Sequence, residues 1–337
     1  MSSVTVWGMH AGSSGEGDDL FLKKDYVAIN WAKVRDLSKI EPHRKDFNAA
    51  FKKAYPDKKD MTIANQSGQQ FRFVHEMKEG DYVIYPSQRD HLVHIGKIDG
   101  GYRYDPSLTE HFQNLRKVKW LKAFPRAHFT QGALYEIGSA MALFQVKSFA
   151  NEFLAALEGK AAPPTEPPDV PALQINADRI EQFTSDHILK RISQDLKGHP
   201  FADLVAHLLN IMGYRTRVSP EGPDGGVDIL AHRDELGFEP PIIKVQVKSS
   251  LDRIGDPIVT ALYGKVGASE HGLFVTLGTF SSQAVNFAKS KTNLRLIDGQ
   301  ELVDLIIAHY DNFDSRYKGL IPLKRVYVPE TLPEEEE

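Results

Sequence analysis

The chain contains no cysteine among its 337 residues. Disulfide bonds, thiolate nucleophiles and zinc sites built on cysteine are therefore excluded. No stretch approaches the ~18 consecutive apolar residues that a membrane-spanning helix needs. The first residues also lack the basic and apolar regions of a secretory signal. These absences predict a soluble, cytoplasmic protein without a membrane partner.

The chain also lacks a strong charge of one sign, since its net charge is only −4. Its overall field does not attract polyanions, which argues mildly against a nucleic-acid partner. Basic residues nevertheless cluster at 116–119 and 289–291, while an acidic run at 334–337 shifts the total. Because binding depends on the local patch, a nucleic-acid partner stays open.

The length predicts about two domains of ~150 residues each. Five prolines between Gly159 and Pro171 are typical of an extended linker. We therefore predict a front domain at 1–158, a linker at 159–175, a rear domain at 176–310, and a tail with an acidic end at 311–337, which is either docked or disordered.

The front domain is predicted to be rich in short strands with glycine between them, which favours a small β-barrel with flanking helices. Its predicted strands are 4–9, 26–31, 71–73, 81–86, 91–98 and 101–104. Its predicted helices are 44–56 and 130–157, and 57–70 is predicted to be a loop.

The rear domain alternates helix and strand, which predicts a two-domain α/β protein whose second sheet is mixed and has helices on both faces. The predicted helices are 177–195, 199–212, 256–269, one from 281, and 300–309. The predicted strands are 215–218, those around Asp228 and Lys248, 272–277 and 294–297.

Two rear strands carry polar residues where apolar ones are expected. Strand side chains alternate between faces, so Asp228 is predicted to point away from Val227 and Ile229. The turn residues between the strands favour an antiparallel pair. That pairing brings Asp228 opposite Val247, within one residue.

On the second strand, Gln246 and Lys248 share the face opposite to Val245 and Val247. A carboxylate, an amide and an ammonium group are therefore predicted to converge on one patch with Asp228.

Oxygen ligands on adjacent strands suit a divalent cation for phosphodiester hydrolysis. Asp228 is a charged hard ligand, and Gln246 and the Val247 backbone carbonyl would add neutral oxygens. Lys248 would orient the attacking water or stabilise developing charge. The alternative is that Asp228 and Lys248 form a surface ion pair across a hairpin.

Several further motifs follow one another over about a third of the chain. They are Met212-Gly213-Tyr214, Asp224 to Asp228, Gln246-Val247-Lys248, Gly272 to Thr276, Phe280-Ser281 and Ile297-Asp298-Gly299. In this order they resemble the Mrr-type branch of the PD-(D/E)xK nuclease superfamily. The resemblance implies a restriction-endonuclease-like sheet, a Mg²⁺ or Mn²⁺ cofactor, and catalytic roles for Asp228, Gln246 and Lys248, with metal ligands Asp228, Gln246 and Val247.

One position departs from that pattern. The family often has Phe-Glu in the helix before Gly-Tyr, whereas this chain has Phe201-Ala202 followed by Asp203. An accessory metal carboxylate is therefore missing there. Glu221 and Asp224 are candidates to replace it, or the site uses one metal.

The front domain resembles PUA and EVE-type barrels through Trp7, Trp31, Gly80 to Tyr85, Ile95 to Ile98 and Val118 to Trp120. Such domains hold a flipped, modified base between aromatic rings. The resemblance gives the base-pocket candidates Trp7, Trp31, Tyr85 and Trp120, and the phosphate-contact candidates Arg116, Lys117 and Lys119. The alternative is that each tryptophan is a core or strand-face aromatic.

Together these patterns predict a modification-dependent DNA endonuclease of a restriction or antiviral defence system. Its partner would be modified double-stranded DNA, and a double-strand break favours a homodimer. Two alternatives remain. One is a nucleic-acid-binding protein whose nuclease-like domain does not cleave, and the other is an RNA- or structure-specific nuclease.

Overall fold

The chain divides into two compact units, residues 1–174 and 175–337. The structure is a computed structural model that describes residues 4–12, 15–160, 177–220, 226–234, 237 and 239–326. Residues 161–175 of the predicted linker lie outside this range. Among the described residues, no helix is long and apolar enough to cross a membrane.

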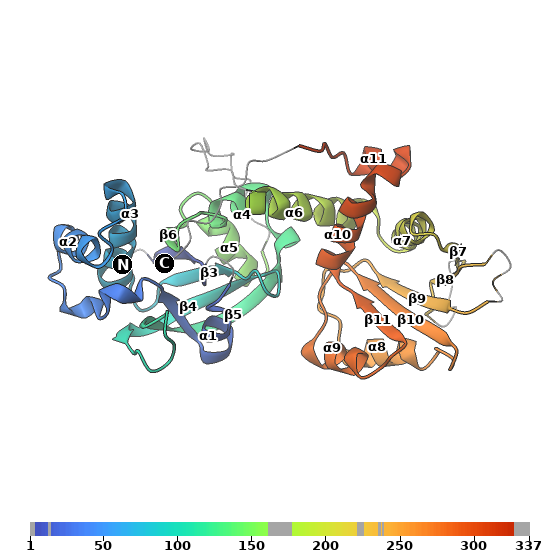
Figure 1. Ribbon diagram of the computed structural model, residues 1–337, viewed down its shortest axis with the longest axis horizontal. Coiled ribbons are helices and arrows are strands. Elements are labelled where there is room, and N and C mark those ends of the chain that lie inside the picture. The colour runs from blue at the N-terminus through green and yellow to red at the C-terminus, as the bar shows by residue number, and fades with distance from the viewer. Residues whose placement is uncertain are drawn as a thin grey trace. The chain divides into compact units, whose positions relative to one another are not determined.

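Unit 1 is built on a curled six-stranded sheet (Figure 1). The strand order is β2-β5-β4-β3-β1-β6, in which β1 runs parallel to β3 and the other pairs are antiparallel. The strands are β1 (Val6–Met9), β2 (Tyr26–Ile29), β3 (Tyr82–Pro86), β4 (Leu92–Tyr104), β5 (Asn114–Pro125) and β6 (Leu143–Gln145).

Two apolar clusters lie on the two faces of this sheet, because strand side chains alternate. On β3, Val83 and Tyr85 belong to one cluster and Ile84 to the other. The helices are α1 (Asp18–Lys24), α2 (Arg44–Ala54), α3 (Asp60–Phe71), the π-helical turn η3 (Arg72–Glu76), α4 (Gln131–Ile137) and α5 (Ala150–Leu157); short 3₁₀ turns are η1 (Ala32–Val34), η2 (Leu37–Lys39) and η4 (Arg126–His128).

The segment α3–η3 bridges the two sides of the curled sheet. At one end of the strand order, the Gln69 side-chain oxygen accepts a hydrogen bond from the Leu143 backbone N–H of edge strand β6, at 3.0 Å. Near the other end, Arg116 of β5 donates to the backbone carbonyls of Phe73 and Val74. The α3–η3 segment therefore contacts strands near both ends of the sheet.

Three expectations for the front domain were wrong. Residues 60–70 of the predicted loop 57–70 form helix α3, and 71–73 complete that helix and begin η3 instead of forming a strand. Polar side chains fill much of the buried face of α3, so apolar periodicity did not reveal it. The predicted helix 130–157 is interrupted by β6, where Leu143 and Phe144 are buried as strand residues.

Unit 2 contains a mixed sheet, as predicted, and its five strands lie in the order β11-β10-β9-β8-β7. Strands β9, β10 and β11 are parallel, and β7, β8 and β9 are antiparallel. The elements are α6 (Ala177–Asp195), α7 (His199–Ile211), β7 (Arg215–Val218), β8 (Ile229–His232), β9 (Ile242–Lys248), α8 (Asp256–Tyr263), β10 (Glu270–Thr276), α9 (Ser282–Lys289), β11 (Leu294–Ile297), α10 (Gly299–His309), η5 (Tyr310–Asn312) and α11 (Ser315–Leu320).

Helices cover both faces of this sheet. Residues of α6, α7 and α10 pack with Val245 and Val275 on one face, and α8 and α9 pack with Phe274 on the other. The described part of the predicted tail also contributes to the core, since Phe313 and Tyr317 are buried in the first of these clusters. The fold is therefore α/β in both units.

Candidate active site

The polar patch lies at the edge where β8 begins beside β9. Ile229 pairs with Val245, so Asp228, directly before β8, comes opposite Gln246, one residue from the predicted partner. Val227 is the exception to the predicted alternation. It packs with the α8–α9 cluster while Ile229 packs on the opposite face, because Asp228 precedes the regular strand.

The Asp228 carboxylate is fixed by backbone contacts. Its Oδ2 atom accepts a hydrogen bond from the Val247 N–H at 2.7 Å, and its own N–H donates to the Val245 carbonyl at 2.8 Å. The N–H and C=O of one strand residue point to the same side. The Val247 carbonyl therefore points toward the Asp228 edge, as a metal ligand at this position requires.

Gln246 lies on the face of β9 that Phe274 shares, since the two residues are paired across β9 and β10. Its side-chain oxygen is buried and has no hydrogen-bond partner among the described residues. A buried acceptor without a donor is costly, by about 1–3 kcal/mol. This oxygen is therefore available to a ligand.

The two lysines on this face of β9 differ. Lys244 forms an ion pair with Glu270 at 2.6 Å, and this hydrogen bond lowers the pKa of the Glu270 carboxyl. Lys248 is exposed and makes no ion pair with Asp228. The alternative of an Asp228–Lys248 surface pair is therefore wrong, and the Lys248 ammonium is free of that carboxylate.

The donor set fits a hard divalent cation. One carboxylate and two neutral oxygens, from Asp228, Gln246 and Val247, border the same edge, and oxygen ligands are those that Mg²⁺ and Mn²⁺ prefer. The described residues contain no group of three or more acidic or histidine side chains placed to hold a metal. Within the described part of the chain, the site thus offers one carboxylate and neutral donors.

The accessory positions give no second carboxylate within the described residues. Glu221 and Asp224 lie outside the described residues and stay predictions. Ala202 is buried in the core, and the Asp203 carboxylate lies 4.0 Å from the His199 ring. Position 202 therefore supplies no carboxylate to the site, unlike the glutamate that the family often has there.

Lys265 is a residue that sequence reasoning missed. A Cβ atom on Gly226 would lie 2.8 Å from the Lys265 ammonium nitrogen and 3.3 Å from the Gln246 amide nitrogen. Gly226 also has a φ of +75°, which favours glycine. The ammonium group therefore lies beside the Gln246 amide, and only the fold brings it from the turn after α8.

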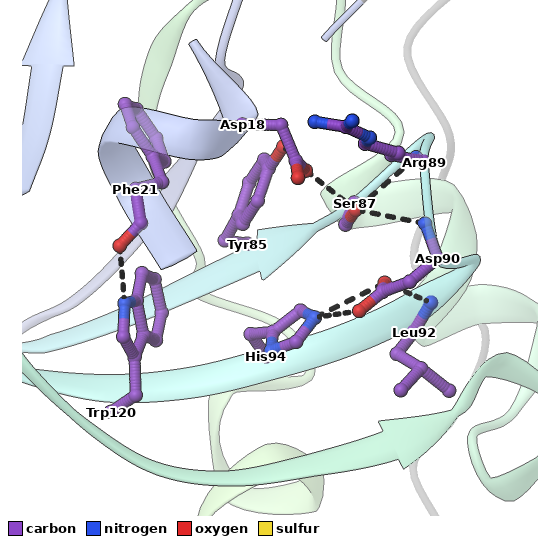
Figure 2. A network of polar contacts seen from close by, with 9 residues as sticks. All are labelled: Asp18, Phe21, Tyr85, Ser87, Arg89, Asp90, Leu92, His94 and Trp120. Atoms are coloured by element: carbon purple, nitrogen blue, oxygen red, sulfur yellow. Dashed lines mark hydrogen bonds and ion pairs between the residues drawn. The ribbon is translucent and has the colours of Figure 1, made fainter. Parts of the chain in front are cut away.

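In unit 1, the structure brings two of the four base-pocket candidates together. The rings of Tyr85 and Trp120 are 6.1 Å apart, and His94 packs 5.9 Å from Trp120 (Figure 2). Tyr85 donates a hydrogen bond to buried Asp18 at 2.7 Å, and Ser87 donates to the same carboxylate at 2.8 Å. Burial and the bond to Asp18 raise the pKa of the Tyr85 phenol far above its usual range.

The network of Figure 2 is well bonded. The Trp120 indole donates to the Phe21 carbonyl at 2.7 Å, and His94 lies 2.9 Å from the Asp90 carboxylate. Sequence patterns did not reveal these partners, because Asp18 lies far from Tyr85 along the chain and Ser87 lies just outside the strand that carries Tyr85. Because its polar groups are bonded to one another, this network resembles a structural core.

The other two tryptophans lie in different surroundings. Trp7 is buried and its indole donates to Asp81 at 2.9 Å, which makes it a core residue. Trp31 is half-buried, two residues after β2 ends, with its ring 6.0 Å from Phe51. The four candidates therefore do not form one pocket.

Of the phosphate-contact candidates, Arg116 must be corrected. It is buried, and its guanidinium donates to three backbone carbonyls, those of Phe73, Val74 and Gly100. It is therefore not placed to contact phosphate. Lys117 lies 3.8 Å from Asp25, and Lys119 is exposed.

A mixed sheet with a carboxylate, an amide and a lysine at one strand edge is an arrangement suited to metal-dependent phosphodiester hydrolysis. Residues 193–306 match the restriction endonuclease family Mrr_cat. Residues 7–146 match a domain of unknown function, DUF8426. Residues 193–306 are therefore an Mrr-type restriction-endonuclease domain, whereas the resemblance of the front region to PUA and EVE domains stays a prediction.

The chain is also 32% identical over 145 residues to the type IV methyl-directed restriction enzyme EcoKMrr of Escherichia coli (strain K12). The similar region covers 41% of this chain and 46% of that enzyme, so the chain spans about half the length of this relative.

Two solved structures show weaker likeness. The DNA modification-dependent restriction endonuclease AspBHI is 16% identical, with a TM-score of 0.33, over 72% of this chain and 66% of that chain. The MspJI restriction endonuclease in complex with a 27-mer oligonucleotide is 15% identical, with a TM-score of 0.34, over 94% of this chain and 71% of that chain. TM-scores this low do not establish a common fold.

Proposed function

We propose that the protein is a modification-dependent DNA endonuclease that uses Mg²⁺ or Mn²⁺. The observation that carries the proposal is the edge between β8 and β9 in the Mrr-type domain. There, the fixed Asp228 carboxylate and the unbonded Gln246 oxygen lie on one strand edge, with Lys248 exposed beyond them.

A divalent cation at this edge would neutralise the scissile phosphate and lower the pKa of an attacking water. Asp228 would hold the cation with its charge, and Gln246 and the Val247 carbonyl would complete the protein ligands. The hydrogen bond from the Val247 N–H holds the carboxylate at the required position.

Lys248 would stabilise the charge that develops on the phosphate, or orient the attacking water. Its freedom from Asp228 supports this role, because a lysine held in an ion pair would first have to leave its partner. Lys265, beside the Gln246 amide, is placed to add a second positive charge for the phosphate backbone.

The substrate we propose is double-stranded DNA that carries a modified base. The relative EcoKMrr, which is 32% identical over 145 residues, is described as methyl-directed. Unit 1 would then select the modified base and unit 2 would cut. A homodimer follows from the chemistry, since one active site cuts one strand.

The test is Mg²⁺-dependent cleavage of DNA panels with unmodified, methylated, hydroxymethylated and glucosylated cytosine, and with unmodified and methylated adenine. We expect one modified panel to be cut and the unmodified DNA to be spared. Equal cutting of all panels would remove the modification dependence while leaving the nuclease. No cutting of any panel, with binding retained, would favour the second candidate below.

The second candidate is a nucleic-acid-binding protein whose nuclease-like domain does not cleave. It is favoured by the single carboxylate that the described residues place at the site and by Ala202 in place of the family's glutamate. The Mg²⁺-dependent cleavage assay separates the two, because this candidate binds DNA in the presence of metal without cutting it.

A further inference from the structure

Four amide side chains of unit 1 carry buried polar atoms without a hydrogen-bond partner among the described residues. For Gln70, both the nitrogen and the oxygen are unbonded, and the residue is 0% exposed. Buried amides are normally bonded, because an unsatisfied donor or acceptor destabilises the fold. The unbonded atoms are Asn30 Oδ1, Gln66 Oε1, Gln70 Nε2 and Oε1, and Asn114 Nδ2.

The strand-side members of this group lie at one end of β2 and β5. Ile29 pairs with Asn114, so Asn30 follows directly at the same end. The Tyr102 hydroxyl donates to the Asn114 oxygen at 2.6 Å. The Asn114 nitrogen has no partner among the described residues. The Tyr102 ring packs 6.5 Å from Phe73 of η3.

The helix-side members approach the same region from α3. Gln70 lies one turn before Phe73, and Gln66 one turn before Gln70, so the three side chains follow one face of the helix. The contact of Phe73 with Tyr102 turns this face toward the β4–β5 ladder. Gln69, one position along, bonds instead to β6 on the other side.

The group runs from the interior to the surface. Gln70 and Asn114 are fully buried, whereas Gln66, Asn30 and Trp31 are half-buried. Asn30, Gln66 and Trp31 therefore form the more exposed end of this region, and Gln70 and Asn114 its buried end. We name Asn30, Gln66, Gln70 and Asn114 the amide group.

We propose that the amide group binds the edge of a nucleobase turned out of the DNA duplex. It offers two unbonded amide nitrogens as donors and three unbonded amide oxygens as acceptors. These complement the mixed donors and acceptors of a base edge. A phosphate has acceptors only, so the three amide oxygens would repel it. Because the group is buried, only a base outside the stack can reach it.

This proposal deepens the proposed function and rests on it, since DNA is the source of the base. It also separates the four aromatic candidates. The Tyr85–Trp120 pair belongs to a bonded network, whereas Trp31 directly follows Asn30 of the amide group along the chain. Trp31 is therefore the aromatic residue placed to stack on the entering base.

The experiment measures binding of the full-length protein, without divalent metal, to fluorescent duplexes that carry unmodified, methylated, hydroxymethylated or glucosylated cytosine, or unmodified or methylated adenine. Gln70→Met keeps the volume of the side chain and removes both polar atoms. We expect it to reduce the preference for the favoured modified duplex by about tenfold or more, the loss of one or two hydrogen bonds. The melting temperature should not fall, because no intramolecular bond is lost.

Gln69→Met is the matched control on the neighbouring position. Gln69 bonds to Leu143 and Asn65, so this variant should lower the melting temperature and keep the preference. If Gln70 instead binds only buried water, Gln70→Met will retain the wild-type preference, and that result overturns the proposal.

The assay also distinguishes failure of the amide-group proposal from failure of base sensing by unit 1. If the wild-type protein prefers one modified duplex and Gln70→Met keeps that preference, the amide group is not the base site and modification dependence stands. If the wild-type protein binds all duplexes equally, base sensing by unit 1 is wrong, and Mg²⁺-dependent cleavage decides the nuclease independently.

Discussion

The Asp18 network and the amide group both place polar side chains inside the curled sheet of unit 1, yet they differ in their bonding. Asp18 accepts hydrogen bonds from Tyr85 and Ser87 (Figure 2). Gln70, equally buried, has no partner for either polar atom among the described residues. Burial of a polar group therefore does not by itself mark a functional site, and the proposed base site rests on unused bonding capacity instead.

The same distinction applies across the two units. Gln246 of unit 2 has an unbonded buried oxygen, like Gln70, while Arg116 of unit 1 is fully engaged with backbone carbonyls, like Asp18. Bonded groups should affect stability when replaced, and unbonded groups should affect function.

The largest effect is expected for Asp228→Asn. The asparagine oxygen can still accept the bond from the Val247 N–H, so the strand edge is kept while the charge is removed. Loss of the one charged ligand should reduce cleavage by about a thousandfold or more. Rates of Mg²⁺-dependent cleavage check this, with an unchanged melting temperature as the control; near wild-type cleavage would remove Asp228 from the site.

Gln246→Leu should have the next largest effect on activity. It removes a neutral oxygen, so cleavage should fall by about ten- to a hundredfold at low Mg²⁺ and recover in part at high Mg²⁺. Stability should be unchanged or higher, because the buried oxygen has no partner to lose. A titration of cleavage rate against Mg²⁺ measures this, and a loss of stability without a shifted metal requirement would contradict it.

Arg116→Ala and Lys119→Ala form a matched pair on β5. Removing Arg116 leaves backbone carbonyls unpaired and should lower the free energy of unfolding by about 3 kcal/mol. Lys119 is exposed, so its removal should change stability by less than about 0.5 kcal/mol. If Lys119 contacts a phosphate, DNA affinity will weaken uniformly across sequences with a shallower salt dependence.

These two outcomes can be separated by chemical denaturation and by DNA titrations at several salt concentrations. A stable Arg116→Ala protein with weakened, salt-dependent DNA binding would restore the original phosphate role of Arg116. Unchanged DNA binding by Lys119→Ala would remove Lys119 from the interface.

The smallest effect concerns pH and the bonded network. Burial alone would raise the pKa of Asp90, but its hydrogen bonds, chiefly with His94, outweigh this and lower it. A carboxyl whose pKa is lower in the folded than in the unfolded state stabilises the fold above about pH 4, and this contribution is lost as the pH falls through the folded value.

Asp90→Asn should therefore lower the free energy of unfolding by about 1 kcal/mol near neutral pH, and the difference from wild type should shrink below about pH 4. Denaturation of both proteins across this pH range measures the difference. A gap that stays constant with pH would show that the Asp90 charge makes no contribution.

Much of unit 2 could be predicted because its pattern is local and strong. Apolar periodicity located α6, α7 and α10, and alternation on β9 placed Gln246 and Lys248 on one face. The predicted cross-strand partner of Asp228, Val247, lies one residue from the observed partner, Gln246. Lys265 could not be predicted, since the turn that carries it approaches Gly226 only in the folded sheet.

Unit 1 was less predictable for a physical reason. Helix α3 buries amide side chains on a face where periodicity looks for apolar ones, so residues 57–70 carried no helical signal. The sequence also could not separate Arg116 from Lys119, because burial of one and exposure of the other depend on where η3 docks.

The sequence by itself determined the chemistry of the candidate active site and the class of fold that holds it, because side-chain alternation and motif order are local properties of the chain. Tertiary structure alone decided which polar groups are bonded. Hydrogen-bond partners such as Asp18 and Tyr85, or the lack of one for Gln70, arise between segments that are distant along the chain. The distinction between a structural network and a candidate base site is therefore set by packing.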